Sequence, residues 1–367
     1  MTAPQITVAI IYGGRSPEHE VSLRSACSVF ESIDKKKYGV QPVFITKDGQ
    51  WFRAPARVES FTHPEDFARD FRLILSPDPS HRGFLRISPG GVIEEFHVDV
   101  CFPVLHGMFG EDGTVQGLMD LANIPYVGCG TLASAVGMDK VIMKAAFRDS
   151  GIKVGPFFWF LNSEWEKDPG SIIERMTRRD CPLFIKPANL GSSVGISRVS
   201  RPDEFEKAIE LAVSYDRKVL VEDAVEGREL EVSVLGNDQP EASVPGEIIS
   251  HSSFYDYHEK YISDTAELVI PASLGSRTTE LAQKVAVAAF KAVDGSGLAR
   301  VDMFLDSNDQ ILVNEINTLP GFTSISMYPK LWEASGIGYT QLIDRLINLA
   351  FQRHELKNRF TMDRFTS

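Results

Sequence analysis

The sequence predicts a multidomain protein that combines an α/β domain with α+β domains. Its 367 residues are enough for two or three domains of about 100–200 residues each. The first hundred residues alternate short apolar runs with helical patterns, which is typical of an open parallel sheet with helices packed on it. Farther along, two apolar strands joined by a glycine-rich turn predict antiparallel pairing, and a strand-rich region follows them.

The N-terminal α/β domain is expected to span residues 1–130. Its predicted strands are nearly continuous apolar runs, as in parallel strands buried on both faces: Ile6–Tyr12, Val40–Thr46 and Val98–Leu105. Ser16 and Pro17 predict the start of a helix after the first strand, because serine is a good N-cap and proline fits the first helical position. Residues 48–97, rich in proline and short β-like runs, are expected to form an insertion.

The remaining chain is expected to form a central domain over residues 131–225 and a C-terminal domain over residues 226–367. One long helix is predicted from Thr131 to Ser150. The central strands and helices then follow in the order Val154–Leu161, Ser171–Arg179, Leu183–Lys186, Gly195–Val199, Asp203–Ser214 and Lys218–Ala224. The C-terminal elements are Glu229–Leu235, Ser243–Ile249, Glu267–Ile270, Thr278–Val293, Ala299–Leu305, Ile311–Asn317 and Tyr339–Arg353.

Composition excludes several classes of protein. The formal net charge is −12, which argues against nucleic acid as a partner. No apolar run approaches the ~20 residues of a membrane helix, and the first apolar run lacks the basic residues of a signal peptide. The four cysteines are far apart and form no CxxC pattern, so zinc and disulfide frameworks are poor interpretations. We therefore expect a cytoplasmic enzyme without membrane or nucleic-acid contacts.

Two glycine-rich patterns differ in strength. The segment Gly128–Ala133 fits a loose dinucleotide fingerprint, but Asp149 lies before the next strand, where the fingerprint needs an acidic residue after it. A tight helix entry is the better interpretation, and a nicotinamide-dependent dehydrogenase remains a rival. The second pattern, KPANLGSSVG over residues 186–195, places Lys186 at the end of an apolar strand before a loop of small residues. Converging backbone N–H groups beside a lysine favour phosphate binding over an ordinary hairpin.

Carboxylates on two neighbouring predicted strands suggest a metal site. Strand alternation puts Arg300 and Asp302 on one face, and likewise Glu315 and Asn317. If the strands pair, three oxygen ligands meet beside an arginine, which is the donor set of magnesium–nucleotide sites completed by phosphate oxygens. A solvated strand face of mixed charge is the simpler explanation for these residues taken alone. The turn between Glu222 and Glu229 could likewise be a plain loop or a hinge strand facing a nucleotide.

Taken in order, these features resemble the ATP-grasp enzymes, and more narrowly the D-alanine–D-alanine ligases. The similarity extends over nearly the whole chain and rests on several specific blocks. These are GGRSPEHEVSL at 13–23, LHG at 105–107, GEDGT at 110–114, MDK at 138–140, KPANLGSSVG at 186–195, FYDY at 254–257, KY at 260–261, GLARVD at 297–302, and NEINTLPG at 314–321 with Thr323 and Ser324. The resemblance implies an ATP-grasp fold behind an N-terminal pre-ATP-grasp domain.

The resemblance also implies a reaction and the residues that carry it out. ATP would phosphorylate one D-alanine, and the amine of a second D-alanine would displace phosphate to give the dipeptide used in peptidoglycan precursors. The implied nucleotide contacts are Lys140, Lys186, Gly191, Ser193, Glu222, Val225 and Glu229. Asp302, Glu315 and Asn317 would hold Mg²⁺ or Mn²⁺, two ions per site. The implied catalytic group is Glu20, Ser192, Tyr261, Arg300, Gly321 and Ser326, with His106 and Lys260 binding substrate.

Arg300 and the Gly321 N–H would form an oxyanion hole for the second step. Residues 251–264 would be a lid whose closure joins Ser192 and Tyr261 to Glu20 and excludes water. The Lys260–Tyr261 pair favours an amine as second substrate, hence D-alanine over D-lactate. Ligases joining D-alanine to D-lactate or D-serine, and a non-catalytic nucleotide-binding module, remain alternatives. A homodimer in the cytoplasm is implied by the family.

Overall fold

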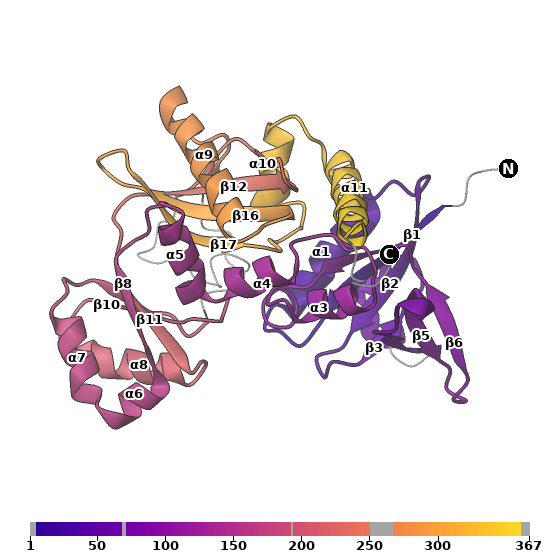
Figure 1. The fold of residues 1–367 in the computed structure, drawn as a ribbon, viewed down its shortest axis with the longest axis horizontal. Helices are drawn as coiled ribbons and strands as arrows, with labels where there is room; N and C mark the ends of the chain where they lie inside the picture. Colours follow the sequence, from indigo (N-terminus) through magenta and orange to yellow (C-terminus); the bar gives the residue numbers. More distant parts are fainter. Residues whose placement is uncertain (1–4, 68–70, 192–193, 250–266, 361–367) are drawn as a thin grey trace, which may run out of the picture.

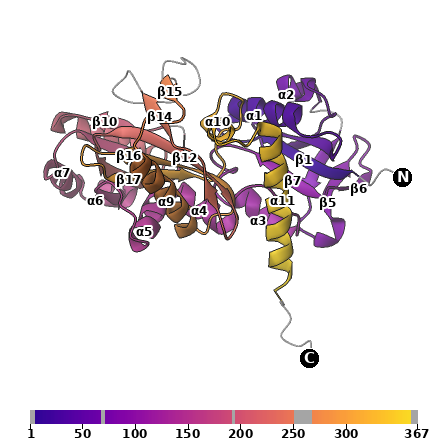
Figure 2. The same cartoon turned by 90° about the horizontal axis from the view of Figure 1, so that it is seen from above.

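In the computed structural model, the described residues are 5–67, 71–191, 194–249 and 267–360. They form three sheets, each with its own helices (Figure 1). Figure 2 shows the N-terminal region on one side of the molecule and the other two regions on the opposite side. The mixed α/β and α+β class predicted from the sequence is confirmed.

The N-terminal sheet has seven strands in the order β6-β5-β4-β3-β2-β1-β7. Their bounds are β1 Ile6–Gly13, β2 Tyr38–Ile45, β3 Trp51–Arg53, β4 Arg72–Leu75, β5 Gly83–Ile87, β6 Ile93–His97 and β7 Val100–Val104. The strand β1 pairs in parallel with both β2 and β7, as expected of buried apolar runs. The insertion at 48–97 extends this sheet with antiparallel strands, so the N-terminal sheet is mixed and only its β2-β1-β7 part is parallel.

Helices α1 His19–Ser32, α2 Glu59–Thr62 and α3 Thr114–Leu121 belong to this region. Prediction of the first helix start was wrong by two residues: Ser16 and Pro17 form a turn, and the Ser16 Oγ accepts from the Glu18 N–H at 3.1 Å. Gly13 makes the turn that aims α1, with φ at +90° and the carbonyl oxygen of Ile45 only 2.2 Å from where a Cβ would lie. No side chain fits there, since that distance is below van der Waals contact.

The predicted long helix is two helices, α4 Thr131–Met138 and α5 Lys140–Asp149. The break is at Asp139, whose extended backbone (φ −85°, ψ 100°) ends α4. Its carboxylate then accepts hydrogen bonds from the N–H groups of Val141 and Ile142, which caps α5. An aspartate with this strong capping preference inside a helical pattern was the overlooked signal.

The central sheet has the order β10-β9-β11-β8, with all its strand pairs antiparallel. Its elements are β8 Phe157–Leu161, α6 Asn162–Lys167, α7 Pro169–Thr177, β9 Leu183–Pro187, β10 Ser197–Val199, α8 Phe205–Val213 and β11 Lys218–Asp223. The antiparallel pairing predicted across the glycine-rich turn is confirmed by β9 and β10.

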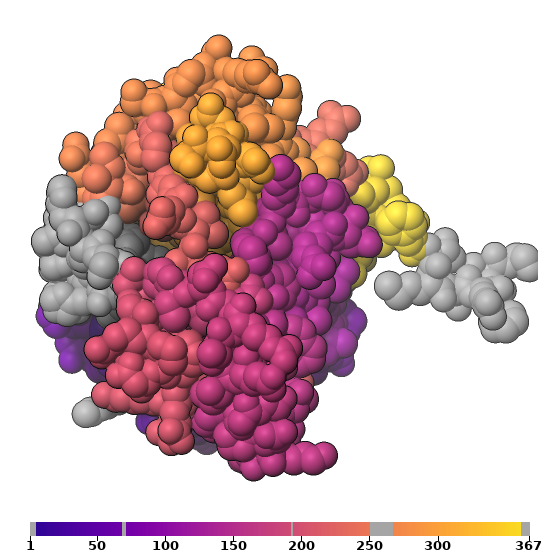
Figure 3. Space-filling view, turned by 90° about the vertical axis from the view of Figure 1, so that its left-hand side faces the viewer, coloured from indigo at the N-terminus to yellow at the C-terminus, as the bar shows by residue number. Residues whose placement is uncertain are grey.

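The C-terminal sheet runs β15-β14-β12-β16-β17, with β13 paired to β12. Its strands are β12 Arg228–Gly236, β13 Glu241–Ala242, β14 Gly246–Ile249, β15 Glu267–Val269, β16 Gly297–Leu305 and β17 Ile311–Asn317. The helices are α9 Ser276–Ala292, α10 Met327–Ala334 and α11 Tyr339–Asn358. Helix α10 was not predicted. On the face drawn in Figure 3, this C-terminal region lies directly above the central one.

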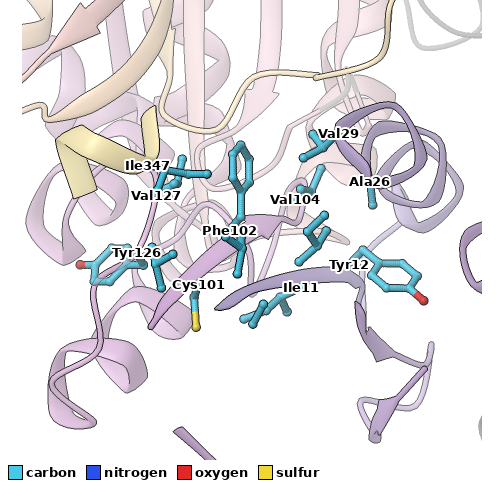
Figure 4. Packing of buried hydrophobic residues seen from close by; sticks show 14 of the residues in the cluster. Ile11, Tyr12, Ala26, Val29, Cys101, Phe102, Val104, Tyr126, Val127 and Ile347 are labelled. Carbon is cyan, nitrogen blue, oxygen red and sulfur yellow. The ribbon is translucent and has the colours of Figure 1, made fainter. Parts of the chain in front are cut away.

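The three largest apolar cores among the described residues follow the three sheets, but two helices cross between regions. Helix α11 packs on the N-terminal sheet, where Ile347 lies near Val127 and Phe102 (Figure 4). Helix α5, placed with the central domain by the sequence, buries Met143 and Phe147 in the core of the C-terminal sheet. The domain limits 1–130, 131–225 and 226–367 therefore stay a prediction. No helix among the described residues is both long and apolar enough to cross a membrane.

Candidate active site

A cleft of about 780 Å³ opens where the three regions meet. Many sequence-predicted site residues line it, drawn from segments far apart in the chain. They are Glu20, His106, Lys140, Gly191, Arg300, Glu315, Asn317, Gly321 and Ser326. A cleft with converging polar side chains at a region boundary is where a small-molecule site is expected.

Helix α1 brings Glu20 to the cleft from the N-terminal sheet. The Glu20 carboxylate is exposed and pairs with Lys47 at 2.6 Å, and this hydrogen bond lowers the pKa of Glu20. Its neighbour Glu18 is buried, and its carboxylate lies against Gly107, where an added Cβ would come within 2.9 Å. With φ at +74° and no side chain, Gly107 permits this close approach of the Glu18 carboxylate.

His106 is buried at the wall of the cleft. Its Nδ1 lies 3.1 Å from the carbonyl oxygen of Leu319, and its Nε2 lies 3.2 Å from the Ser25 Oγ. Burial lowers the pKa of His106, but the neighbouring Glu111 carboxylate, 3.7 Å away, and the charge of Glu18 outweigh it. The pKa of His106 is therefore raised, which favours a positively charged imidazolium facing the cleft.

Arg300 is held by two buried carboxylates. Its Nε and Nη2 donate to the two oxygens of Asp302 at 2.7 Å each, a bidentate pair. The Glu231 carboxylate lies 3.1 Å from the same Nε. The two carboxylates are almost fully buried, so each needs a positively charged partner to offset the cost of removing it from water. Their contacts therefore fix the position of the Arg300 guanidinium in the cleft wall.

The predicted ligand strands pair as expected, with Asp302 opposite Glu315 and Arg300 opposite Asn317. The Asn317 Nδ2 donates to Asp302 at 3.0 Å. Within the described residues no three His, Cys, Asp or Glu side chains form a ready-made metal site. Two carboxylates and an amide oxygen on adjacent strands nevertheless fit a hard cation such as Mg²⁺ whose remaining ligands come from phosphate.

Lys140, at the start of α5, lines the same cleft. Its Nζ donates to the carbonyl oxygen of Leu190 at 2.7 Å and lies 3.7 Å from the Glu315 carboxylate. The Leu190 carbonyl directly precedes Gly191, so this lysine also ties the start of the small-residue loop to the cleft. A buried lysine beside that loop supplies the positive charge that a phosphate needs.

Glu222, on β11, lies between two lysines. Lys186 on β9 contacts one carboxylate oxygen at 2.6 Å, and Lys144 on α5 contacts the other at 2.7 Å. Burial raises the pKa of Glu222, but the two lysines overcome this and lower it to about 2. Burial likewise opposes the charge of Lys186, yet Glu222 keeps the pKa of that lysine above its ordinary value. Burial lowers the pKa of Lys144, although the Glu222 carboxylate acts against that lowering.

The segment before α10 also lines the cleft. The Ser326 Oγ accepts from the Thr323 N–H at 3.0 Å and lies 2.8 Å from the Thr323 hydroxyl. Gly321 is packed against Ser326, whose Oγ is 3.1 Å from the position of an added Cβ. These contacts set a hydroxyl and backbone groups on one short turn in the lining of the cleft, which Arg300 also lines.

Several predicted residues lie elsewhere. Asp302, Lys186, Glu222, Val225 and Glu229 are outside the lining of the cleft, with Asp302 screened by its contacts to Arg300 and Asn317. Ser192, Ser193, Lys260 and Tyr261, with the expected lid at 251–264, fall outside the described residues.

Sequence reasoning missed three charged residues. Lys144 follows Lys140 by one helical turn, and Glu231 follows Glu229 by two strand positions, so both share a face with a predicted residue. That spacing was the available signal for each. Glu111 was quoted as part of a glycine-rich block, but nothing in its spacing pointed to His106.

Comparisons with known proteins match nearly the whole chain. Residues 7–129 match the family described as D-ala D-ala ligase N-terminus, and residues 146–348 match D-ala D-ala ligase C-terminus. The D-alanine--D-alanine ligase of Natranaerobius thermophilus is 46% identical over 98% of both chains. That of Heliobacterium modesticaldum is 47% identical, also over 98% of both.

Solved structures show the same relationship. The D-alanine-D-alanine ligase from Coxiella burnetii is 36% identical, with a TM-score of 0.87 over 97% of both chains. The VanG D-Ala:D-Ser ligase from Enterococcus faecalis is 38% identical, with a TM-score of 0.86 over 95% of this chain and 100% of that one. In both cases the similarity covers at least 95% of this chain.

Proposed function

The chain belongs to the D-alanine–D-alanine ligase family, and on that premise we propose how its cleft joins two D-alanine molecules. The enzyme ligates D-alanine to D-alanine with ATP, releases ADP and phosphate, and supplies the dipeptide for peptidoglycan precursors. The observation that carries the assignment of roles is the cleft itself. It combines groups suited to a metal–phosphate complex, the cations Lys140 and Arg300 and the carboxylate Glu315, with groups suited to an amino acid, Glu20 and Ser326.

In the first step an oxygen of one D-alanine carboxylate attacks the terminal phosphorus of ATP, and ADP leaves. Such a transfer depends on positioning and on neutralising charge. We assign that neutralisation to Lys140, Lys186 and the loop of Gly191 and Ser193. A divalent cation held by Asp302, Glu315 and Asn317, as one or two ions, would offset the phosphate charge.

In the second step the amine of the other D-alanine attacks the acyl phosphate carbon. The carbonyl oxygen becomes negative as the tetrahedral centre forms, and the C–O bond to phosphate then breaks. Arg300 and the Gly321 N–H are proposed to stabilise this oxygen, because both residues line the cleft and both can donate hydrogen bonds to a developing oxyanion. The two carboxylates that hold Arg300 keep the guanidinium in place during the step.

Substrate orientation is assigned to the two ends of the cleft. The ammonium of the first D-alanine would replace Lys47 at the Glu20 carboxylate, a like-for-like exchange of cations. His106 would face the first carboxylate. Ser326 and Lys260 would bind the carboxylate of the second D-alanine, and closure of residues 251–264 would bring Tyr261 and Ser192 to Glu20. The backbone at Glu222 and Val225 and the side chain of Glu229 are proposed for adenine and ribose.

A second candidate activity is ligation of D-serine, supported by the similarity to the VanG D-Ala:D-Ser ligase. Both second substrates attack through an amine, so the chemistry of the cleft is shared, and the identity of the product distinguishes the two activities. We further propose a homodimer in the cytoplasm, which family membership supports and sedimentation of the purified protein would test.

The test measures phosphate release from Mg-ATP together with the mass of the product. The additions are D-alanine alone, L-alanine alone, D-alanine with D-lactate, D-alanine with D-serine, or none. The proposal expects release that requires D-alanine, with D-alanyl-D-alanine as product. A dominant mixed dipeptide with D-serine would support the second candidate, and a dominant depsipeptide would contradict the amine preference. ATP binding without any turnover would contradict an enzymatic role.

A further inference from the structure

Lys144 is a buried cation outside the predicted site. It lies on α5 with a relative exposure of 1%, and its Nζ contacts Glu222 Oε1 at 2.7 Å and donates to the carbonyl oxygen of Asn314 at 2.9 Å. A lysine so deeply buried is unusual unless it is paired and hydrogen-bonded, as it is here. Neither contact involves the cleft lining, so its role is exerted through its partners.

Lys144, Glu222 and Lys186 form one chain of contacts, hereafter the buried triad. Both oxygens of Glu222 are engaged, one by each lysine, at 2.7 and 2.6 Å. The Lys144 Nζ lies against a carboxylate and a carbonyl oxygen, two acceptors that suit a protonated amine. With both lysines protonated and Glu222 ionised, the triad carries one net positive charge. If Glu222 faced Lys186 alone, it would cancel the charge of that lysine entirely. Lys144 therefore preserves the positive charge that Lys186 presents to a phosphate.

The triad also joins the two sheets that flank the nucleotide. Lys186 and Glu222 belong to the central sheet, on the paired strands β9 and β11. Asn314 belongs to β17 of the C-terminal sheet and directly precedes Glu315, which lines the cleft. Lys144 contacts both sheets at once and lies one turn after Lys140, which contacts Leu190 and Glu315. Its single ammonium thus spans the junction between the two sheets.

We propose that Lys144 is a positioning residue of the ATP site, which shares the charge of Glu222 and so holds Lys186 ready for the phosphates of ATP. The proposal rests on the ATP-dependent function described above. It assigns the Glu222 carboxylate to the two lysines and leaves only the backbone of Glu222 for the nucleotide. Loss of Lys144 should weaken the binding of ATP and leave the binding of D-alanine unchanged.

The net charge of the triad distinguishes a positioning role of Lys144 from a purely structural one. Lys144→Met leaves no net charge, whereas the double variant Lys144→Met/Glu222→Gln restores the single positive charge on Lys186. Lys144→Met should weaken ATP binding about tenfold, the loss expected for one charge-assisted hydrogen bond. The double variant should recover at least part of that affinity. A purely structural lysine predicts the opposite, since the second substitution would add its own damage.

The experiment measures the Kd of ATP in the presence of Mg²⁺ by calorimetry on the full-length enzyme, with KM for ATP and D-alanine and the thermal midpoint of each variant. Lys207→Met is the matched control, because Lys207 is exposed on α8. The expected result is a raised Kd and KM for ATP in Lys144→Met, an unchanged KM for D-alanine, and recovery in the double variant.

Two results would overturn the proposal. One is ATP affinity in Lys144→Met within about twofold of wild type, which is smaller than the loss of a single hydrogen bond. The other is a double variant that binds ATP no better than the single one while remaining folded. If Lys144→Met does not fold, Lys144→Arg keeps the charge and is expected to retain ATP affinity. Failure of the wild-type protein to bind ATP would instead contradict the proposed function.

Discussion

Replacement of Arg300 separates its catalytic role from its structural one. Arg300 donates twice to Asp302 at 2.7 Å and contacts Glu231 at 3.1 Å, and the side chains of those carboxylates are only 5% and 4% exposed. Arg300→Met strands both buried charges. Breaking a buried pair by removing one partner costs about 3–5 kcal/mol, so this variant should be clearly destabilised.

The loss of an oxyanion donor should be visible as a separate effect on kcat. One such donor is worth about 10²–10³ in rate. Arg300→Lys retains the positive charge but loses the planar fork, so it should fold better than Arg300→Met while kcat still falls about 10²-fold. Adding Glu231→Gln to Arg300→Met removes one stranded carboxylate, and it should restore part of the stability without restoring kcat.

The assay is steady-state phosphate release at saturating ATP and D-alanine, normalised to folded protein, alongside thermal unfolding of each variant. A kcat for Arg300→Lys within about threefold of wild type would refute the assignment of Arg300 to the transition state, since that effect is far below one donor. Stability and kcat that recover together in the double variant would show that Arg300 acts only through folding.

Three further predictions concern the rest of the site. Because the pKa of Glu222 is lowered from 4.5 to about 2, its ionised form stabilises the fold above pH 4.5, and this stabilisation is lost as pH falls toward about 2. The free energy of unfolding of Glu222→Gln should therefore fall less steeply than that of the wild type over this pH range. Chelation of divalent cations should abolish turnover, Mg²⁺ or Mn²⁺ should restore it, and Asp302→Asn should need more Mg²⁺; turnover that persists in EDTA contradicts the metal assignment. Ser326→Ala should raise KM for the second D-alanine about tenfold, because one hydrogen bond to a charged group is lost. Ser214→Ala, at an exposed position, is the control. An unchanged KM in Ser326→Ala would show that Ser326 does not bind the second D-alanine.

Much of the fold was predictable because its strands carry a strong local signal. Apolar runs such as Ile6–Tyr12 and Leu183–Lys186 are strands in the structure within a few residues. The break at Asp139 was missed because the apolar periodicity continues through it, and the capping preference of one side chain decides the outcome. The packing of α11 on the N-terminal sheet depends on tertiary contacts, which no local sequence pattern predicts.

The site was predictable where spacing maps onto geometry. Alternation placed Arg300 with Asp302, and Glu315 with Asn317, and the strand register brings these pairs together. The partners of buried charges were harder to foresee. Glu222 is paired with Lys144 across 78 positions of sequence, and only the docking of α5 on β11 determines that contact. Long-range ion pairs of this kind follow from tertiary packing and not from periodicity.

The most direct test of the central claim follows one oxygen atom. D-Alanine labelled with ¹⁸O in its carboxylate is supplied with Mg-ATP, and the phosphate released is analysed by mass. If the carboxylate attacks the terminal phosphorus and the amine later expels phosphate from carbon, one labelled oxygen passes from D-alanine to each phosphate formed on the first substrate. Phosphate that carries no label while dipeptide accumulates would contradict an acyl phosphate route, and with it the roles assigned to Lys140, Arg300 and Gly321.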